Sequence, residues 1–179
     1  SKKILINVDP RSGGDFFCLF MKEQLLLAWD IHNQKNLLLL SQLSATELNT
    51  SSTSRSRTVA EQLAHVHNVR LQWVESVAKA AYQKSMLLPK DTALTSTVLK
   101  EAFQNSAGII RQVIEQSWEA GGKLPSFKTG LISFISYLVS HESHHRGNIL
   151  LTLKQSGYKI PDSLKWGLWE WSVLPKQAL

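Results

Sequence analysis

The chain has 179 residues, of which 43% are hydrophobic and 19% charged, and its formal net charge at pH 7 is +6. This length suits one domain with a single core, and the apolar fraction excludes a disordered or fibrous chain. The basic residues are scattered rather than gathered into a stripe, so we expect no nucleic-acid partner. The single cysteine, Cys18, excludes an internal disulfide framework and favours a cytoplasmic location.

Four long segments show the helical pattern, in which apolar residues recur every three or four positions. They span residues 16–43, 58–83, 96–119 and 130–155. The second segment begins with a capping box, because Thr58 stands three residues before Glu61. Glycines follow the third and fourth segments and predict their ends. The stretch 41–53, rich in Ser, Thr and Asn, is expected to be a loop, and no segment alternates like a strand.

These elements predict an all-α fold, a four-helix bundle in a single domain over residues 1–179. We expect residues 1–15 to form an N-terminal extension and residues 158–179 a C-terminal tail. The tail contains Trp166, Trp169 and Trp171, and we expect it to pack on one end of the bundle or to join a homodimer. The apolar runs fall far short of the roughly 20 residues that cross a bilayer, so neither a membrane span nor a secretion signal is expected.

Five of the six histidines fall in two clusters, each on a predicted helix. In the last segment His141 and His145 are four residues apart, so they are neighbours about 6 Å apart on one helix face. Stepping from Leu131 by three and four residues places both on the face that should be buried. An unsatisfied polar group in a core costs on the order of 1–3 kcal/mol, so two imidazoles together require a partner. A divalent metal is favoured over a hydrogen-bonded pair, because neutral imidazole is a common metal ligand.

The second segment offers His65 and His67 as the third ligand of a tri-histidine site. Their side chains point about 200° apart, so both cannot face one metal. A helical wheel places His67 about 80° and His65 about 120° from the middle of the apolar stripe, which slightly favours His67. His144 points away from the pair and is expected at the surface or beside the ligands, and His32 is expected to be structural or exposed.

Residues 141–145, HESHH, also match the zinc-peptidase pattern H-E-x-x-H, in which the glutamate is the general base. A peptidase needs a third ligand further along the chain, and no histidine follows His145. The extended pattern needs a glycine three residues after the second histidine, whereas Gly147 is only two residues after it. A peptidase cleft also normally uses an edge strand, and so we do not expect peptidase activity.

At these motifs the chain resembles the DinB/YfiT-like family of metalloenzymes. The resemblance rests on the capped stretch from Thr58 to His65 and on residues 141–148, HESHHRGN, which are similar to the family pattern H-x-x-H-H-R-G-Q with Asn148 in place of glutamine. It spans roughly residues 21–157 and implies a four-helix bundle, often dimeric, with a divalent metal held by three histidines. Matched residue by residue, these are His65, His141 and His145, with His67 as the alternate. We expect Zn²⁺ or Ni²⁺, with Fe or Mn as the alternatives.

Relatives include transferases and isomerases that use a low-molecular-weight thiol. The resemblance therefore implies metal-dependent activation of such a thiol for S-transfer to a small electrophile. Arg70 and Arg146 could attract an anionic thiol or substrate, or could be plain surface charges. One alternative is a metal-dependent small-molecule hydrolase with Glu142 or His144 as the base. The other is a non-catalytic stress or binding protein that the metal stabilises.

Overall fold

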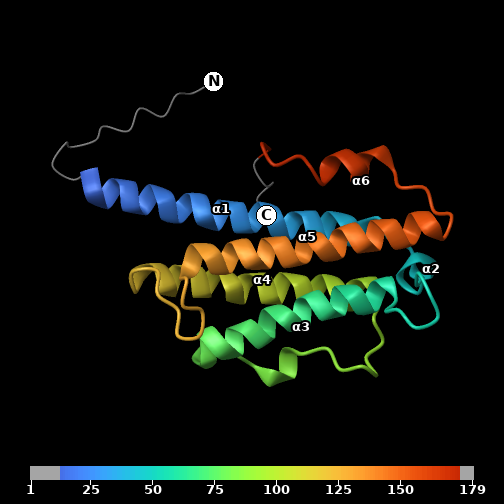
Figure 1. The fold of residues 1–179 in the computed structure, drawn as a ribbon, viewed down its shortest axis with the longest axis horizontal. Coiled ribbons are helices and arrows are strands. Elements are labelled where there is room, and N and C mark those ends of the chain that lie inside the picture. The colour runs from blue at the N-terminus through green and yellow to red at the C-terminus, as the bar shows by residue number, and fades with distance from the viewer. Residues whose placement is uncertain (1–12, 174–179) are drawn as a thin grey trace.

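The computed structural model describes residues 13–173, which form helices and connecting turns without any strand (Figure 1). The long helices are α1 (Gly13–Ser41), α3 (Val59–Val77), α4 (Ser96–Glu119) and α5 (Leu131–Gln155). The short helices are α2 (Ala45–Leu48) and α6 (Asp162–Gly167), with the 3-10 helices η2 (Lys79–Ala81) and η3 (Lys84–Met86). The predicted all-α class is therefore confirmed. Most of the predicted N-terminal extension and the last six residues of the predicted tail lie outside the described residues.

The four long helices lie side by side, and both α1 and α3 contact α4 and α5 (Figure 1). The predicted capping box opens α3, because the Thr58 hydroxyl accepts from the Glu61 amide at 3.1 Å and the Glu61 carboxylate accepts from the Thr58 amide at 2.7 Å. Among the residues that the structure describes, no helix combines the length and the apolar character that a membrane crossing requires.

The chain after α3 folds back on this helix instead of extending it. The sequence pattern predicts a helix to residue 83, but α3 ends at Val77. His67 donates a hydrogen bond from Nε2 to the carbonyl oxygen of Met86 at 2.8 Å, and the Asn68 amide bonds both backbone groups of Leu88 at 2.9 Å. These side chains satisfy backbone groups of the segment that follows α3 and so hold it against the helix.

A short helix interrupts the stretch that composition predicts to be a loop. In α2 the Ser44 hydroxyl accepts from the Glu47 amide at 3.3 Å, and the Glu47 carboxylate accepts from the Ser44 amide at 2.8 Å. This is the same capping box that opens α3. The expectation of a loop over residues 41–53 is therefore wrong for residues 45–48.

The buried apolar side chains form two separate clusters, one toward each end of the four long helices. A layer of buried polar side chains lies between them, and each long helix contributes to it: His32 from α1, Arg70 from α3, Ser106 from α4 and Glu142 from α5. On every helix this polar position falls between members of the two clusters. The first apolar cluster includes Leu39, Leu63, Phe103 and Ile149. The second includes Trp29, Val74, Ile110 and Phe134.

The C-terminal tail lies along the side of α1. Leu164 is buried in the first apolar cluster, and Gly167 lies so close to Leu38 that an added Cβ would stand 2.7 Å from its Cδ2 atom. Trp166 and Trp169 are 62% and 79% exposed. The expected packing of the tail on one end of the helices is therefore not confirmed.

Candidate metal centre

Three histidines from two helices meet in the groove between α3 and α5. His65 projects from α3, and His141 and His145 project from successive turns of α5. One ring nitrogen from each lies within 4.8 Å of the other two, and all three side chains are half-buried. Ligand nitrogens around a tetrahedral cation with metal–nitrogen distances of about 2.1 Å stand about 3.4 Å apart. Small side-chain rotations would therefore bring the three nitrogens to coordination distance.

The imidazoles of this trio are suited to bind a cation. Burial is the largest cause of a lowered pKa in all three rings. The Arg57 charge lowers the pKa of His65 further, whereas at His141 the Glu142 charge partly opposes the effect of burial. The pKa of His145 is lowered to about 4. Burial is the largest cause, followed by the charges of His141 and His65 and then by weaker neighbouring charges. The Nδ1 atoms of His141 and His145 are buried without a hydrogen-bond partner among the described residues. Neutral rings with unpaired nitrogens fit a metal ion better than they fit a hydrogen-bonded cluster.

His67, the alternate ligand, lies elsewhere. Its side chain is 1% exposed and bonds Met86 on the far side of α3 from the trio. The wheel favoured His67 because it ranked the two histidines by burial. The three imidazoles gather at the rim of the core, however, and the structure brings His65 to the α5 pair.

The fully buried face of α5 runs through Glu142. We expected this face to pass through His141 and His145, which are only half-buried, whereas Glu142 is 1% exposed. Successive helix residues differ by about 100° in direction, so a carboxylate that faces the core turns the neighbouring His141 toward the α3–α5 groove.

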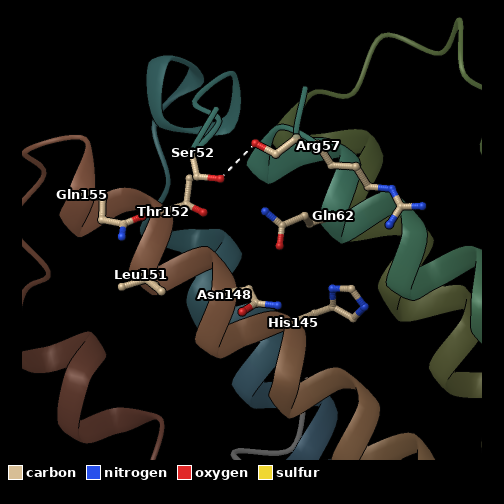
Figure 2. A pocket seen from close by; sticks show the side chains of 9 residues that line it. Ser52, Arg57, Gln62, His145, Asn148, Leu151, Thr152 and Gln155 are labelled. Atoms are coloured by element: carbon tan, nitrogen blue, oxygen red, sulfur yellow. Dashed lines mark hydrogen bonds between the residues drawn. The ribbon is translucent and has the colours of Figure 1, made fainter. Parts of the chain in front are cut away.

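A polar hollow opens beside His145 (Figure 2). Arg57 and Gln62 form one wall, before and within the start of α3, and His145 and Asn148 of α5 form the facing wall. His144 is exposed next to this wall, and its Nε2 atom accepts a hydrogen bond from the Asn148 amide at 2.9 Å. Arg57 was not among the residues expected at the site, and its only signal in the sequence is a positive charge immediately before the capping box.

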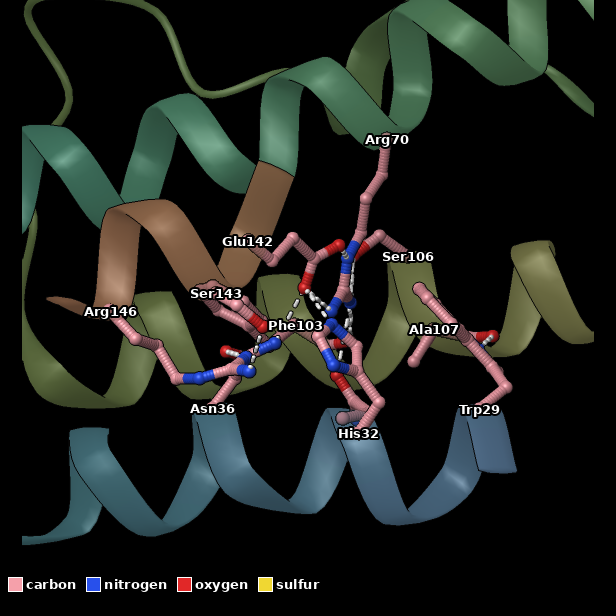
Figure 3. A network of polar contacts seen from close by, with 11 residues as sticks. Trp29, His32, Asn36, Arg70, Phe103, Ser106, Ala107, Glu142, Ser143 and Arg146 are labelled. Carbon is pink, nitrogen blue, oxygen red and sulfur yellow. Dashed lines mark hydrogen bonds and ion pairs between the residues drawn. The ribbon is translucent and has the colours of Figure 1, made fainter. Parts of the chain in front are cut away.

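Glu142 is bound by a buried network that joins all four long helices (Figure 3). Arg70 donates from Nε and Nη2 to the two carboxylate oxygens, each at 2.7 Å. His32 and Asn36 bond the second oxygen at 2.8 and 2.6 Å. Burial alone would raise the pKa of Glu142, but the Arg70 charge and the His32 contact hold it well below its usual range. The carboxylate is therefore ionised and fully engaged in the core.

The rest of the Arg70 guanidinium is also satisfied inside the protein. Its Nη1 atom donates to Asn33 Oδ1 at 3.0 Å and to the Phe103 carbonyl and the Ser106 hydroxyl at 3.2 Å. The rings of Trp29 and Phe103 each lie 4.9 Å from its central carbon. Arg70 is 0% exposed, so it is neither a surface charge nor free to attract an anion, and the expectation for this residue is wrong.

Arg146 and His32 are also tied to this network. Arg146 donates to Asn36 Oδ1 at 2.6 Å and to the Ser143 hydroxyl at 2.7 Å. Burial lowers the pKa of Arg146 to about 10, which leaves it charged at neutral pH. His32 is 0% exposed, so of the two roles expected for it the structural one is confirmed.

Removal of the Glu142 charge should destabilise the fold. We predict that Glu142→Gln lowers the free energy of unfolding by about 3–5 kcal/mol, because the Arg70 charge stays buried without its carboxylate. Urea denaturation measures this difference. Glu119→Gln is the matched control, because it breaks an ion pair with Lys22 in which the carboxylate side chain is 72% exposed, and it should cost less than about 1 kcal/mol. Equal losses in the two variants would contradict the role assigned to Glu142.

Acid should destabilise the metal-free protein through the trio. Because the pKa of His145 is about 4 in the folded chain and about 6.5 in an unfolded one, the unfolded state binds more protons between these values. The neutral His145 ring therefore contributes stability that is fully present above pH 6.5 and is lost as the pH falls toward 4. At pH 5, we predict that His145→Gln takes up about one proton fewer on unfolding than the parent chain. At pH 8 the two should not differ, and an unchanged uptake at pH 5 would contradict the lowered pKa.

Comparison with known proteins identifies the family of this chain. The model of the DinB family matches residues 17–164, which include all three histidines and the buried network. No significant match occurs among the curated proteins or the solved structures. The family match covers well over half of the sequence, and the chain belongs to the DinB family.

Proposed function

We propose that this chain is a divalent-metal-dependent enzyme that activates a low-molecular-weight thiol for S-transfer to a small electrophile. The observation that supports it most is the convergence of the His65, His141 and His145 nitrogens within 4.8 Å. In this proposal the four long helices are the four-helix bundle of the family. The three histidines hold Zn²⁺ or Ni²⁺, or alternatively Fe or Mn. When bound by three neutral ligands, such a cation supplies a Lewis acid that favours deprotonation of a thiol or of water at neutral pH.

The protein's own residues orient the reactants and exclude competing ligands. Tyr137 stacks on the His141 ring, with centroids 5.9 Å apart and planes 20° apart, and so limits its rotation. Glu142 is bound to Arg70, so this carboxylate does not compete for the cation. In the transfer step the thiol gives its proton to solvent, and its sulfur forms the new bond to carbon. The leaving group departs with the electron pair of the bond that breaks.

A thiol is favoured over water by the lack of a carboxylate base. Among the described residues, neither the polar hollow beside His145 nor the trio itself includes an Asp or Glu. A free thiol has a pKa of about 8.5, whereas water has a pKa of about 15.7, so a thiol needs far less help to lose its proton. The hydrolase alternative depends on Glu142 or His144 as the base. Glu142 is engaged in the core, and the Nε2 atom of His144 already accepts a hydrogen bond from the Asn148 amide.

Metal content tests the ligand assignment. We predict that protein purified without a His tag binds one divalent ion per chain, measured by mass spectrometry. The variants His65→Ala, His141→Ala and His145→Ala should each lower the metal affinity by more than about a hundredfold. Loss of a group that only hydrogen-bonds a metal ligand already lowers the affinity about 10–100-fold. His144→Ala is the matched control, since His144 is the exposed neighbour of the trio. An equal loss in His144→Ala, or full metal retention in the trio variants, would contradict the site.

A conjugation assay tests the reaction. The metal-loaded protein is mixed with 1-chloro-2,4-dinitrobenzene and with glutathione, bacillithiol or mycothiol in turn, and release of chloride is followed. We predict turnover with at least one thiol, and its loss on chelation of the metal and in His141→Ala. Circular dichroism verifies that this variant is folded. Metal binding without any thiol dependence would remove the transferase proposal, and ester hydrolysis without thiol would favour the hydrolase.

A further inference from the structure

Two hollows lie between α3 and α5, one on each side of the histidine trio along the helix axes. The polar hollow already described contains His145 and extends along α5 to Gln155. The second hollow contains His65 and His141 and extends the other way, to Tyr137 on α5 and Ser76 on α3. Their volumes are about 280 and 390 Å³, close to the lower limit of about 300 Å³ for ligand pockets. The trio therefore separates two spaces, each of a size that suits part of a small molecule.

The polar hollow has the chemistry of an anion site. Arg57 is exposed and has no carboxylate partner among the described residues, and no Asp or Glu lines the hollow. The amides of Gln62, Asn148 and Gln155 provide further donors and acceptors. From His145 to Gln155 the helix rises about 15 Å, which matches an extended chain of about four residues. An elongated, polar ligand with a carboxylate or phosphate group fits this space.

The second hollow has a more aromatic lining. No Asp, Glu, Lys or Arg lines it, and its walls besides the two histidines are Trp73, Tyr137 and Val69 together with the uncharged polar Gln72 and Ser76. Trp73 is held edge-on by Phe127 and Phe134, with centroids 5.3 and 6.1 Å away. Tyr137 is 37% exposed and keeps one orientation through its stacking on His141. Fixed aromatic walls favour a flat, apolar group, because such groups stack with little loss of side-chain freedom.

We propose that the trio lies between two substrate subsites that are filled at the same time. Arg57 anchors an elongated anionic ligand in the polar hollow, and Tyr137 with Trp73 binds a flat aromatic group in the second hollow. In the proposed thiol transfer, the first ligand is the thiol and the second is the electrophile, and their reactive ends meet at the trio. Only this last assignment rests on the proposed function, since the two binding preferences follow from the walls alone.

Unreactive probes test the two subsites separately from catalysis. Calorimetry measures the binding of S-methylglutathione, which is anionic and has no free thiol, and of 1,3-dinitrobenzene, which has no leaving group. Arg57→Gln should weaken S-methylglutathione about tenfold by removing a charge-assisted contact, and leave dinitrobenzene unchanged. Tyr137→Leu should weaken dinitrobenzene several-fold and leave S-methylglutathione unchanged. Saturation with one probe should not displace the other.

Two controls match these variants. Arg55→Gln removes an exposed arginine that does not line the polar hollow, and Trp169→Leu removes an exposed aromatic side chain on the tail. Neither should change the affinity for either probe. Competition between the probes, lack of saturable binding, or equal effects of Arg55→Gln and Arg57→Gln would overturn the two-subsite arrangement.

The same measurements separate this inference from the proposed function. Selective probe binding in a chain that takes up no metal would retain the two subsites and remove the metalloenzyme. Metal- and thiol-dependent turnover without the selective effects of Arg57→Gln and Tyr137→Leu would retain the enzyme and overturn the subsites.

Discussion

The ion pair between Arg70 and Glu142 is the constraint on which the candidate site depends. A buried pair of this kind is costly to desolvate, and it persists only when further hydrogen bonds satisfy both groups. Here α1 and α4 provide those bonds through His32, Asn36 and Ser106, so all four long helices meet at one polar layer. Since the layer lies between two apolar clusters, sliding or rotating one helix would leave a charge unpaired. The network thus fixes the rotation of α5, and with it the direction in which His141 and His145 project.

The same arrangement sets the electrostatics of the trio. Glu142 directly follows His141 in the chain, yet its negative charge is balanced by Arg70 rather than by a metal. A cation held by His65, His141 and His145 would therefore keep its full positive charge, because all three ligands are neutral. That charge favours the deprotonated form of whatever it binds. Had the carboxylate been a fourth ligand, it would have weakened this effect and filled an open coordination position.

Local sequence signals predicted the helices and the α5 pair, because capping boxes and four-residue spacings act within one helix. The box at Thr58 was identified, whereas the equivalent box at Ser44 was hidden by the loop-like composition around it. The wheel correctly made His67 the more buried of the two histidines, but burial was the wrong criterion for a ligand, because the three imidazoles that meet lie at the rim of the core. Resemblance to a family selected the residue that the structure brings to the pair. The role of Arg70 was missed because its partners lie on three other helices.

The pattern H-E-x-x-H at residues 141–145 shows why spacing alone does not assign a reaction. Its two histidines occupy one face of α5 next to His65, as a metal site requires. Its glutamate differs in function from the peptidase base, because both carboxylate oxygens are occupied by core side chains. A residue that is 1% exposed and paired with a guanidinium has no access to a bound water. In this fold the glutamate stabilises the scaffold.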